Sequence, residues 1–359
     1  MNLASTLVIA HVLLATPSAA LRGGTPPADG RAIALFPVQN RTGDAAAGAA
    51  VAASLRGDLG RLGRLVGQGE TRDALRRLRI RNGDRVAPLL LRQLGSELAA
   101  DWLASATLHE ADRSLVPGLT LSVRLYSADT GELLWTGFRG ESGLDRQTLL
   151  GLGTIADVEA LAPLVSRDLL RDLPQAASIA GAVGPREPRR SRLGTVAVVP
   201  FTGSTEWQAT LSAEAVTEAA LARLFADGVR LVSPNRLHDL LRRLQGGQWG
   251  GVTAETRAAL ARTAATDTIL TGAVETYDLG GGESEPEPAV AIALRLLDAS
   301  TGRILWTGSS ERRGWDRHGL FRRGRVHSRG ALAQRVLEDL ARRLDRERIP
   351  VAPRPEGQQ

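Results

Sequence analysis

Seven arginines lie between residues 312 and 329, together with one acid and with tryptophan and phenylalanine side chains. They are Arg312, Arg313, Arg317, Arg322, Arg323, Arg325 and Arg329. Seven positive charges less that of Asp316 leave +6, which equals the formal net charge of the whole chain. Arginine binds phosphate and carboxylate through a planar fork of donors and stacks on aromatic rings. This arginine segment therefore indicates binding of anions, and its alternative interpretation is a solvated loop before the last helix.

Two histidines, His318 and His327, stand within or beside this positive charge. Positive neighbours disfavour a bound cation, so we predict no metal site. Asp145-Arg146 and Asp316-Arg317 follow similar tryptophan strands, and we expect the two aspartates to cap or pair locally.

The glycines at 280–282 lack the strand–turn–helix context of a phosphate-binding loop, and we expect a flexible hairpin tip there. Glu283, Glu285 and Glu287 alternate with serine and proline, which predicts a solvated acidic loop.

Residue usage excludes several chemistries. All 45 basic residues are arginine and there is no cysteine, so lysine Schiff bases, the P-loop lysine, thiol nucleophiles and disulfides are absent. We find no Ser-His-Asp elbow and no paired carboxylates with supporting context, and we predict a chain that is not an enzyme and binds no cofactor.

An apolar run at residues 3–15 has the length of a signal peptide, and Ser18-Ala19-Ala20 supplies small residues for cleavage. We expect a signal peptide over residues 1–20, cleaved after Ala20, and a periplasmic or secreted protein; an uncleaved leader that anchors the chain is the alternative. No later stretch has the roughly 20 apolar residues of a membrane helix, so no transmembrane span is expected after cleavage.

The chain contains an internal repeat. Three blocks recur in the same order: AIALFP at 32–37 with TVAVVP at 195–200, DALRRL at 73–78 with DLLRRL at 239–244, and SADTGELLWTG at 127–137 with DASTGRILWTG at 298–308. The offset of about 165 residues is the size of a domain, which predicts tandem duplication.

The first half of each copy alternates strands and helices. In the second copy, an apolar run at Val196–Pro200 predicts a buried strand, and apolar residues at helical spacing between Leu211 and Leu224 predict a helix. A short strand at Val229–Val232 precedes Ser233, which is expected to cap a helix that starts at Pro234. Thr253 is expected to cap the next helix.

The second half of each copy is β-rich. Large apolar residues at 290, 292, 294 and 296 alternate with alanine and arginine, which predicts a strand with one strongly buried face. Gly131 and Gly302 lie where a hairpin needs positive φ, and Trp135 and Trp306 on the following strands are expected in the core.

Each copy thus reads β-α-β-α-α-β-β-β-α. We predict an α/β (α+β) fold of two tandem similar domains, each a mixed sheet covered by helices. The expected boundaries are residues 31–174 and 194–349, with a Gly-, Pro- and Arg-rich linker at 175–193 and a disordered tail at 350–359.

These strand ends and hairpins resemble a family of bacterial envelope α/β domains that includes the amino-terminal domain of TolB, the periplasmic part of the curli secretion channel CsgG and lipoprotein activators of peptidoglycan synthases. The matching segments are 196–201, 268–274 and 296–306 in the second copy, and 33–37, 102–108 and 125–135 in the first. The chain lacks the lipid-anchor cysteine that the channel and the activators carry.

The resemblance implies a protein that binds other envelope proteins and is not a catalyst. We therefore expect a non-catalytic, exported interaction module that acts in envelope assembly or secretion, with envelope proteins as partners and no nucleic acid. The alternative is a peripheral binder of an anionic envelope polymer or lipid through the arginine segment, 312–329.

Overall fold

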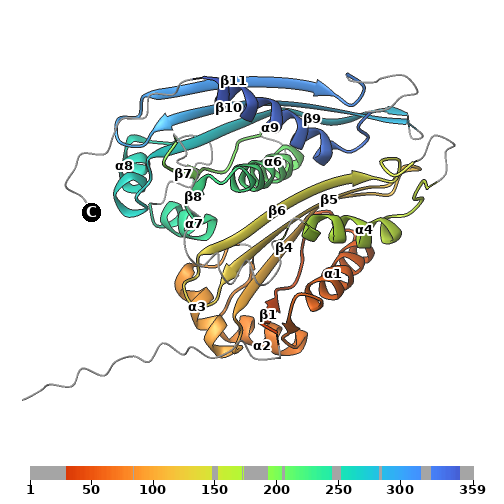
Figure 1. The fold of residues 1–359 in the computed structure, drawn as a ribbon, viewed down its shortest axis with the longest axis horizontal. Coiled ribbons are helices and arrows are strands. Elements are labelled where there is room, and N and C mark those ends of the chain that lie inside the picture. Colours follow the sequence, from red (N-terminus) through yellow and green to blue (C-terminus); the bar gives the residue numbers. More distant parts are fainter. Residues whose placement is uncertain are drawn as a thin grey trace, which may run out of the picture.

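The computed structural model describes residues 30–83, 85–147, 153–171, 173, 193–203, 207–244, 252–282, 285–316 and 325–347. These residues form two mixed sheets with helices packed against them, which confirms the predicted fold class (Figure 1). We call the elements β1 to α4 the first unit and β7 to α9 the second unit.

The first unit contains a sheet with strand order β3-β1-β4-β5-β6, and β2 extends it beside β4. Its strands are β1 (Ala32–Leu35), β2 (Gln39–Asn40), β3 (Arg64–Leu65), β4 (Trp102–Asp112), β5 (Gly118–Ser127) and β6 (Leu133–Ser142). Its helices are α1 (Ala45–Gly60), α2 (Gln68–Arg77), α3 (Pro88–Glu97) and α4 (Val158–Arg171). Strand β1 is parallel to β3 and β4, and β4, β5 and β6 are antiparallel.

The second unit has the corresponding order, β8-β7-β9-β10-β11, with the same parallel and antiparallel pairs. Its strands are β7 (Thr195–Val198), β8 (Arg230–Leu231), β9 (Thr268–Gly282), β10 (Glu285–Asp298) and β11 (Ile304–Arg313). Its helices are α6 (Trp207–Ala226), α7 (Pro234–Arg243), α8 (Ala254–Thr263) and α9 (Arg329–Arg346). The element order predicted from the sequence therefore holds in the second unit, and in the first unit apart from the additional two-residue strand β2.

Several local predictions are confirmed. The Thr253 hydroxyl accepts a hydrogen bond from the backbone N–H of Thr256 at 3.1 Å, as a helix cap should. Gly131 and Gly302 have φ of 73° and 78°, and both hairpin tryptophans are buried. Ser233 precedes α7 as expected, but its side chain makes no capping hydrogen bond.

The glycines at 280–282 lie at the end of the β9–β10 hairpin, as predicted, but the prediction that they and Glu285 and Glu287 form a loop was wrong. Strand β9 continues through Gly282, and β10 begins at Glu285 and pairs with it. Strand β11 pairs with β10 only from Ala289 onward, and β7 pairs with β9 only as far as Leu270, so the end of the hairpin has open edges. Open edges tolerate polar and glycine residues that resemble a loop in sequence. Glu283 lies outside the described residues.

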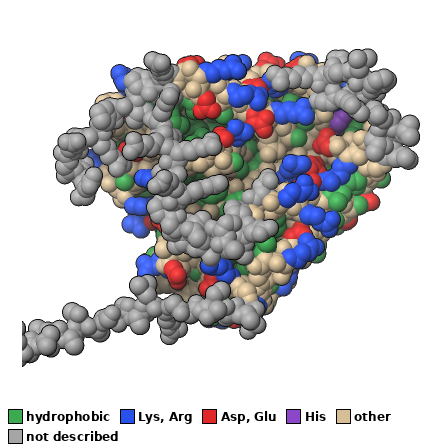
Figure 2. Space-filling view, in the orientation of Figure 1, with side chains coloured by type: hydrophobic (Ala, Val, Ile, Leu, Met, Phe, Trp, Pro, Cys, Tyr) green, Lys and Arg blue, Asp and Glu red, His purple; other side chains and the backbone are tan. Residues whose placement is uncertain are grey.

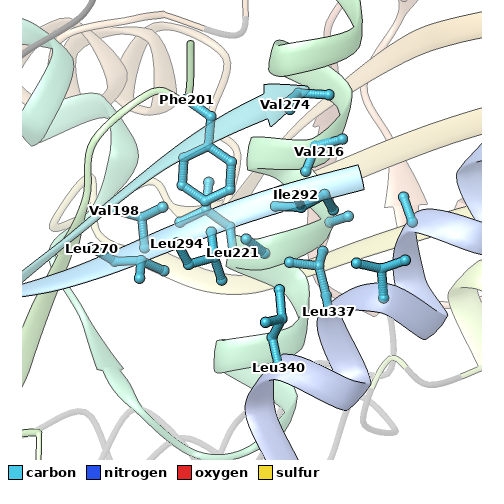
Figure 3. Packing of buried hydrophobic residues seen from close by; sticks show 14 of the residues in the cluster. Val198, Phe201, Val216, Leu221, Leu270, Val274, Ile292, Leu294, Leu337 and Leu340 are labelled. Carbon is cyan, nitrogen blue, oxygen red and sulfur yellow. The ribbon is translucent and has the colours of Figure 1, made fainter. Parts of the chain in front are cut away.

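Helices α6 and α9 lie between the two sheets (Figure 1). On one side they pack against β7, β9, β10 and β11 in a large apolar cluster (Figure 3), which includes Val198, Phe201, Val216, Ile292 and Leu337. On the other side they contact β6 of the first unit, and Phe138 of β6 belongs to the same cluster. A helix that is apolar on more than one face is stable only when neighbours cover both faces.

Candidate functional site: the sheet faces and arginine clusters

The first sheet has an outer face that the second unit covers. Arg124 of β5 donates to Glu218 of α6, with 2.9 Å between Nε and Oε2, and both side chains are almost fully buried. Burial alone lowers the pKa of a guanidinium, but the adjacent Glu218 carboxylate outweighs this and raises the pKa of Arg124. A buried ion pair adds little to stability by itself. Removing one partner is strongly destabilising, because the other charge then stays buried without compensation.

Further polar contacts join the units at both ends of this face. The Tyr126 hydroxyl donates to Asn235 Oδ1 at 3.0 Å, and Gln334 Nε2 donates to the Phe138 carbonyl at 3.0 Å. Arg41 Nη2 donates to Glu214 Oε1 at 3.0 Å. These bonds connect β-strand and loop residues of the first unit to α6, α7 and α9, and they fix how the two units pack.

Close backbone approach also fixes the packing. A Cβ atom at Gly140 of β6 would lie 2.5 Å from the Ala331 nitrogen and 2.6 Å from Gly330, at the start of α9. That distance is too short for any side chain, so Gly140 lets the helix start rest directly on the strand.

The arginine segment does not form one uniform patch among its described residues. Arg312 pairs with Asp339 of α9, and Arg329 Nε lies 3.2 Å from Glu110 Oε1 of the first unit. Because both side chains are ion-paired and largely buried, their charge is compensated inside the protein. Arg317, Arg322 and Arg323 lie outside the described residues.

The other two described arginines of the segment agree better with the predicted anion-binding surface. Arg313 is exposed at the end of β11, and the Arg325 guanidinium carbon lies 4.4 Å from the centre of the Trp315 ring. Figure 2 shows arginine and acidic side chains interspersed on the displayed face.

The remaining sequence candidates have structural contacts. Asp145 Oδ2 accepts from the Ser142 N–H and Asp316 Oδ2 from the Arg313 N–H, both at 2.7 Å, which confirms local capping. Burial raises the pKa of Asp145 above its ordinary value. His327 Nδ1 lies 3.4 Å from the Pro286 carbonyl, and His318 is outside the described residues. Within the described ranges, no group of three or more histidine or acidic side chains is arranged to hold a metal ion.

Sequence reasoning did not find a second arginine cluster, in the first unit. Arg72 and Arg76 of α2 and Arg81 of the following loop line an open pocket of about 400 Å³ together with Gln39 and apolar side chains. The signal was present, since residues 72–85 contain six arginines, Arg72, Arg76, Arg77, Arg79, Arg81 and Arg85.

By fold, the described chain belongs to the class of mixed α/β proteins with two sheet-and-helix units. No protein-family model and no curated protein matches it. Among the helices of the described residues, none combines the length and apolar character needed to cross a membrane.

Three solved structures are similar to part of the chain. Lipoprotein GNA1162 from Neisseria meningitidis is 17% identical, over 43% of this chain and 99% of that one, with a TM-score of 0.31. The PelC dodecamer from Paraburkholderia phytofirmans is 22% identical, over 42% and 85%, with a TM-score of 0.27. The LpoB C-terminal domain from Escherichia coli is 18% identical, over 33% and 82%, with a TM-score of 0.23.

Proposed function

We propose that the chain is a non-catalytic, exported protein of the bacterial cell envelope that acts by binding other envelope proteins, in envelope assembly or secretion. We also propose that its two units arose by duplication of one domain of the TolB and CsgG type, at residues 31–174 and 194–349. The observation that carries the proposal is the direct packing of two units with the same strand order, which presents exposed charged side chains on both.

The packing between the units supports a role in binding. The second unit docks on the first by placing helices on a sheet face, with the Arg124–Glu218 ion pair and a hydrogen bond from the Gln334 side chain to the Phe138 carbonyl at the contact. The leader at residues 1–20 supports export, and the strand-end motifs support an envelope location.

Fractionation of cells that express the full chain tests export. We expect the protein in the periplasmic fraction with Leu21 as its amino-terminal residue. A leader variant, Leu13→Arg, interrupts the apolar run and serves as the control that should stay in the cytoplasm. Cytoplasmic protein that retains Met1 would contradict the proposal.

In-cell photo-crosslinking from surface positions then tests partner binding. We expect discrete adducts with envelope proteins that are lost when the cells are lysed in denaturant before irradiation. A chain that is exported but gives no adduct from any exposed position would leave the interaction role without support.

A second candidate function is binding of an anionic envelope polymer or lipid through the arginine segment, favoured by the exposed Arg313 and the Arg325–Trp315 stack. Changing Arg313, Arg317, Arg322 and Arg323 to glutamine should weaken binding to phosphatidylglycerol vesicles, with strong salt dependence. The matched control changes Arg64, Arg79, Arg92 and Arg262, which removes the same charge elsewhere. Equal binding by both variants would exclude this function.

A further inference from the structure

The pocket in the first unit lies where the topology favours a ligand. Strand β1 has β3 on one side and β4 on the other, and both are parallel to it. Helix α1 packs on one face of this sheet, whereas α2 and α3 pack on the opposite face. The connections between strands therefore lead to opposite sides of β1. Parallel sheets bind ligands outside the carboxyl ends of their strands at such a topological switch point. Pro37 and Gln39, which line the pocket, follow the carboxyl end of β1.

The pocket is strongly positive. Three guanidinium groups line it, from Arg72, Arg76 and Arg81, and no described lining residue is a carboxylate. Arg76 pairs with Asp73 at 2.6 Å, whereas no described carboxylate pairs with Arg72 or Arg81, and both side chains are exposed. Two exposed guanidinium forks beside a concave surface form a site for carboxylate or phosphate oxygens.

The lining also has an apolar part. Leu75 is buried and Ile80 is half-buried, and both belong to the apolar cluster between α2, α3 and the sheet. Pro37 and Gly83 complete the surface, and the Gln39 amide, whose nitrogen donates to the Pro37 carbonyl at 3.5 Å, has a second N–H donor and an acceptor for a ligand. The pocket therefore suits a ligand that combines anionic groups with an apolar group.

The size and lining of the pocket favour a peptide over a single phosphate group. A volume of about 400 Å³ is in the range of binding pockets for whole small molecules and is far larger than a single phosphate. Residues of the second and third turns of α2 line the pocket, so no N–H groups of that helix start point into it, as they do in many phosphate sites. A donor-and-acceptor amide fits a peptide backbone better than it fits a fully ionised phosphate.

We propose that this pocket binds a short acidic segment of a partner protein. Two carboxylates of the segment bind Arg72 and Arg81, and an apolar side chain between them packs on Leu75 and Ile80. The proposal rests on the proposed function in one respect, namely that the partners are proteins.

The second unit provides the matched control. Its repeat DLLRRL aligns with DALRRL of α2, so Arg242 and Arg243 of α7 correspond to Arg76 and Arg77, and His238 corresponds to Arg72. Arg242 and Arg243 both pair with Asp239 and are mostly exposed. The variants Arg72→Gln/Arg81→Gln and Arg242→Gln/Arg243→Gln therefore remove the same charge from exposed positions in different units.

The test measures fluorescence anisotropy of the folded full chain with a labelled peptide in which two aspartates flank a leucine. We expect binding tighter than about 1 mM, a loss of about tenfold for each of Arg72 and Arg81, and a change below about twofold for the α7 double variant. A peptide with asparagine in place of aspartate should not compete, and added salt should weaken binding.

Three outcomes would overturn the pocket assignment. They are no binding of the acidic peptide, equal losses in the two double variants, and binding of phosphatidylglycerol vesicles or inorganic phosphate that depends on Arg72 and Arg81 while the peptide does not bind. Envelope adducts that form equally with wild type and Arg72→Gln/Arg81→Gln would reject the pocket and leave the proposed function in place. If the peptide binds as expected but cell fractionation shows that the chain is never exported, the proposed function is rejected and the pocket assignment stands.

Discussion

Arg124 and Arg295 occupy the same position in the two sheets but differ in environment. Arg124 of β5 is paired with Ser105 and Thr136 across the ladder, and Arg295 of β10 with Thr271 and Thr307. Arg124 is buried against Glu218, whereas Arg295 is exposed. Both sheets share the same strand order, so strand order does not determine which sheet has its outer face covered. A few side chains on that face determine whether helices pack on it.

Neighbouring positions show the same difference. Gly140 lies opposite Thr120 and admits the start of α9, while the corresponding Glu311 lies opposite Ala291 and is exposed. Phe138 is buried in the apolar cluster, whereas the corresponding Ser309 is exposed. The first sheet is thus shaped to receive helices, and the second presents polar side chains to its surroundings.

The largest effect is expected from breaking the buried ion pair. Glu218→Ala leaves the Arg124 guanidinium buried without its partner, and we expect a loss of about 3–5 kcal/mol in the free energy of unfolding. Arg295→Ala removes the equivalent exposed arginine and should change it by less than about 0.5 kcal/mol. Urea titrations followed by circular dichroism measure both, and equal losses would contradict the difference between the two faces.

A smaller effect is expected from the glycine contact. Gly140→Ala places a methyl group against the start of α9, which should destabilise the protein by about 1–3 kcal/mol. Glu311→Ala, at the corresponding exposed position, should be nearly neutral. If the alanine at position 140 is tolerated without loss, α9 does not rest on β6 as described.

The smallest effect concerns acid stability in the first unit. Asp44 caps α1 by accepting from the Ala47 N–H at 2.9 Å, and Arg113 binds both Asp44 and Glu159 of α4. The hydrogen bond from Arg113 lowers the pKa of Asp44 from 3.8 to about 2. A carboxyl with a lowered pKa stabilises the fold above its unfolded value and loses that contribution as pH falls through the folded value.

Stability that depends on Asp44 should therefore be present above about pH 4 and decline between about pH 4 and 2. Asp44→Asn should be less stable than wild type at pH 7 and should approach it at pH 2. Thermal melts at the two pH values measure this, and a constant difference between the proteins would contradict the cap.

Local structure could be predicted from the sequence because it depends on nearby residues. Apolar spacing, turn glycines and Thr253 are sufficient for the element order, the hairpins and one helix cap. The interface between the units could not be predicted in this way, because Ser105, Thr120 and Ser122 of the first sheet are polar residues of the kind found on solvated faces, yet they are buried.

One signal for that interface was present. Alanine and other apolar residues of α6 occupy more than one side of the helix, from Ala213 to Leu224, and a helix of this kind needs two covering layers. The arginine segment was harder to interpret, because the partners of Arg312 and Arg329 come from α9 and from the first unit, at positions that no local pattern connects to the segment. The pocket at Arg72 was not predicted because Arg72 and Arg76 alternate with the apolar residues of a helix, and Arg81 comes from the loop that follows it.

Arginine-directed chemical labelling tests the central claim, that one sheet face is covered and its counterpart is open. The folded full chain would be treated with a dicarbonyl reagent and its modified arginines mapped by mass spectrometry; the chain has no lysine to compete. We predict rapid modification of Arg295 and protection of Arg124 until the protein unfolds. Equal modification of the two arginines in the folded chain would contradict the account.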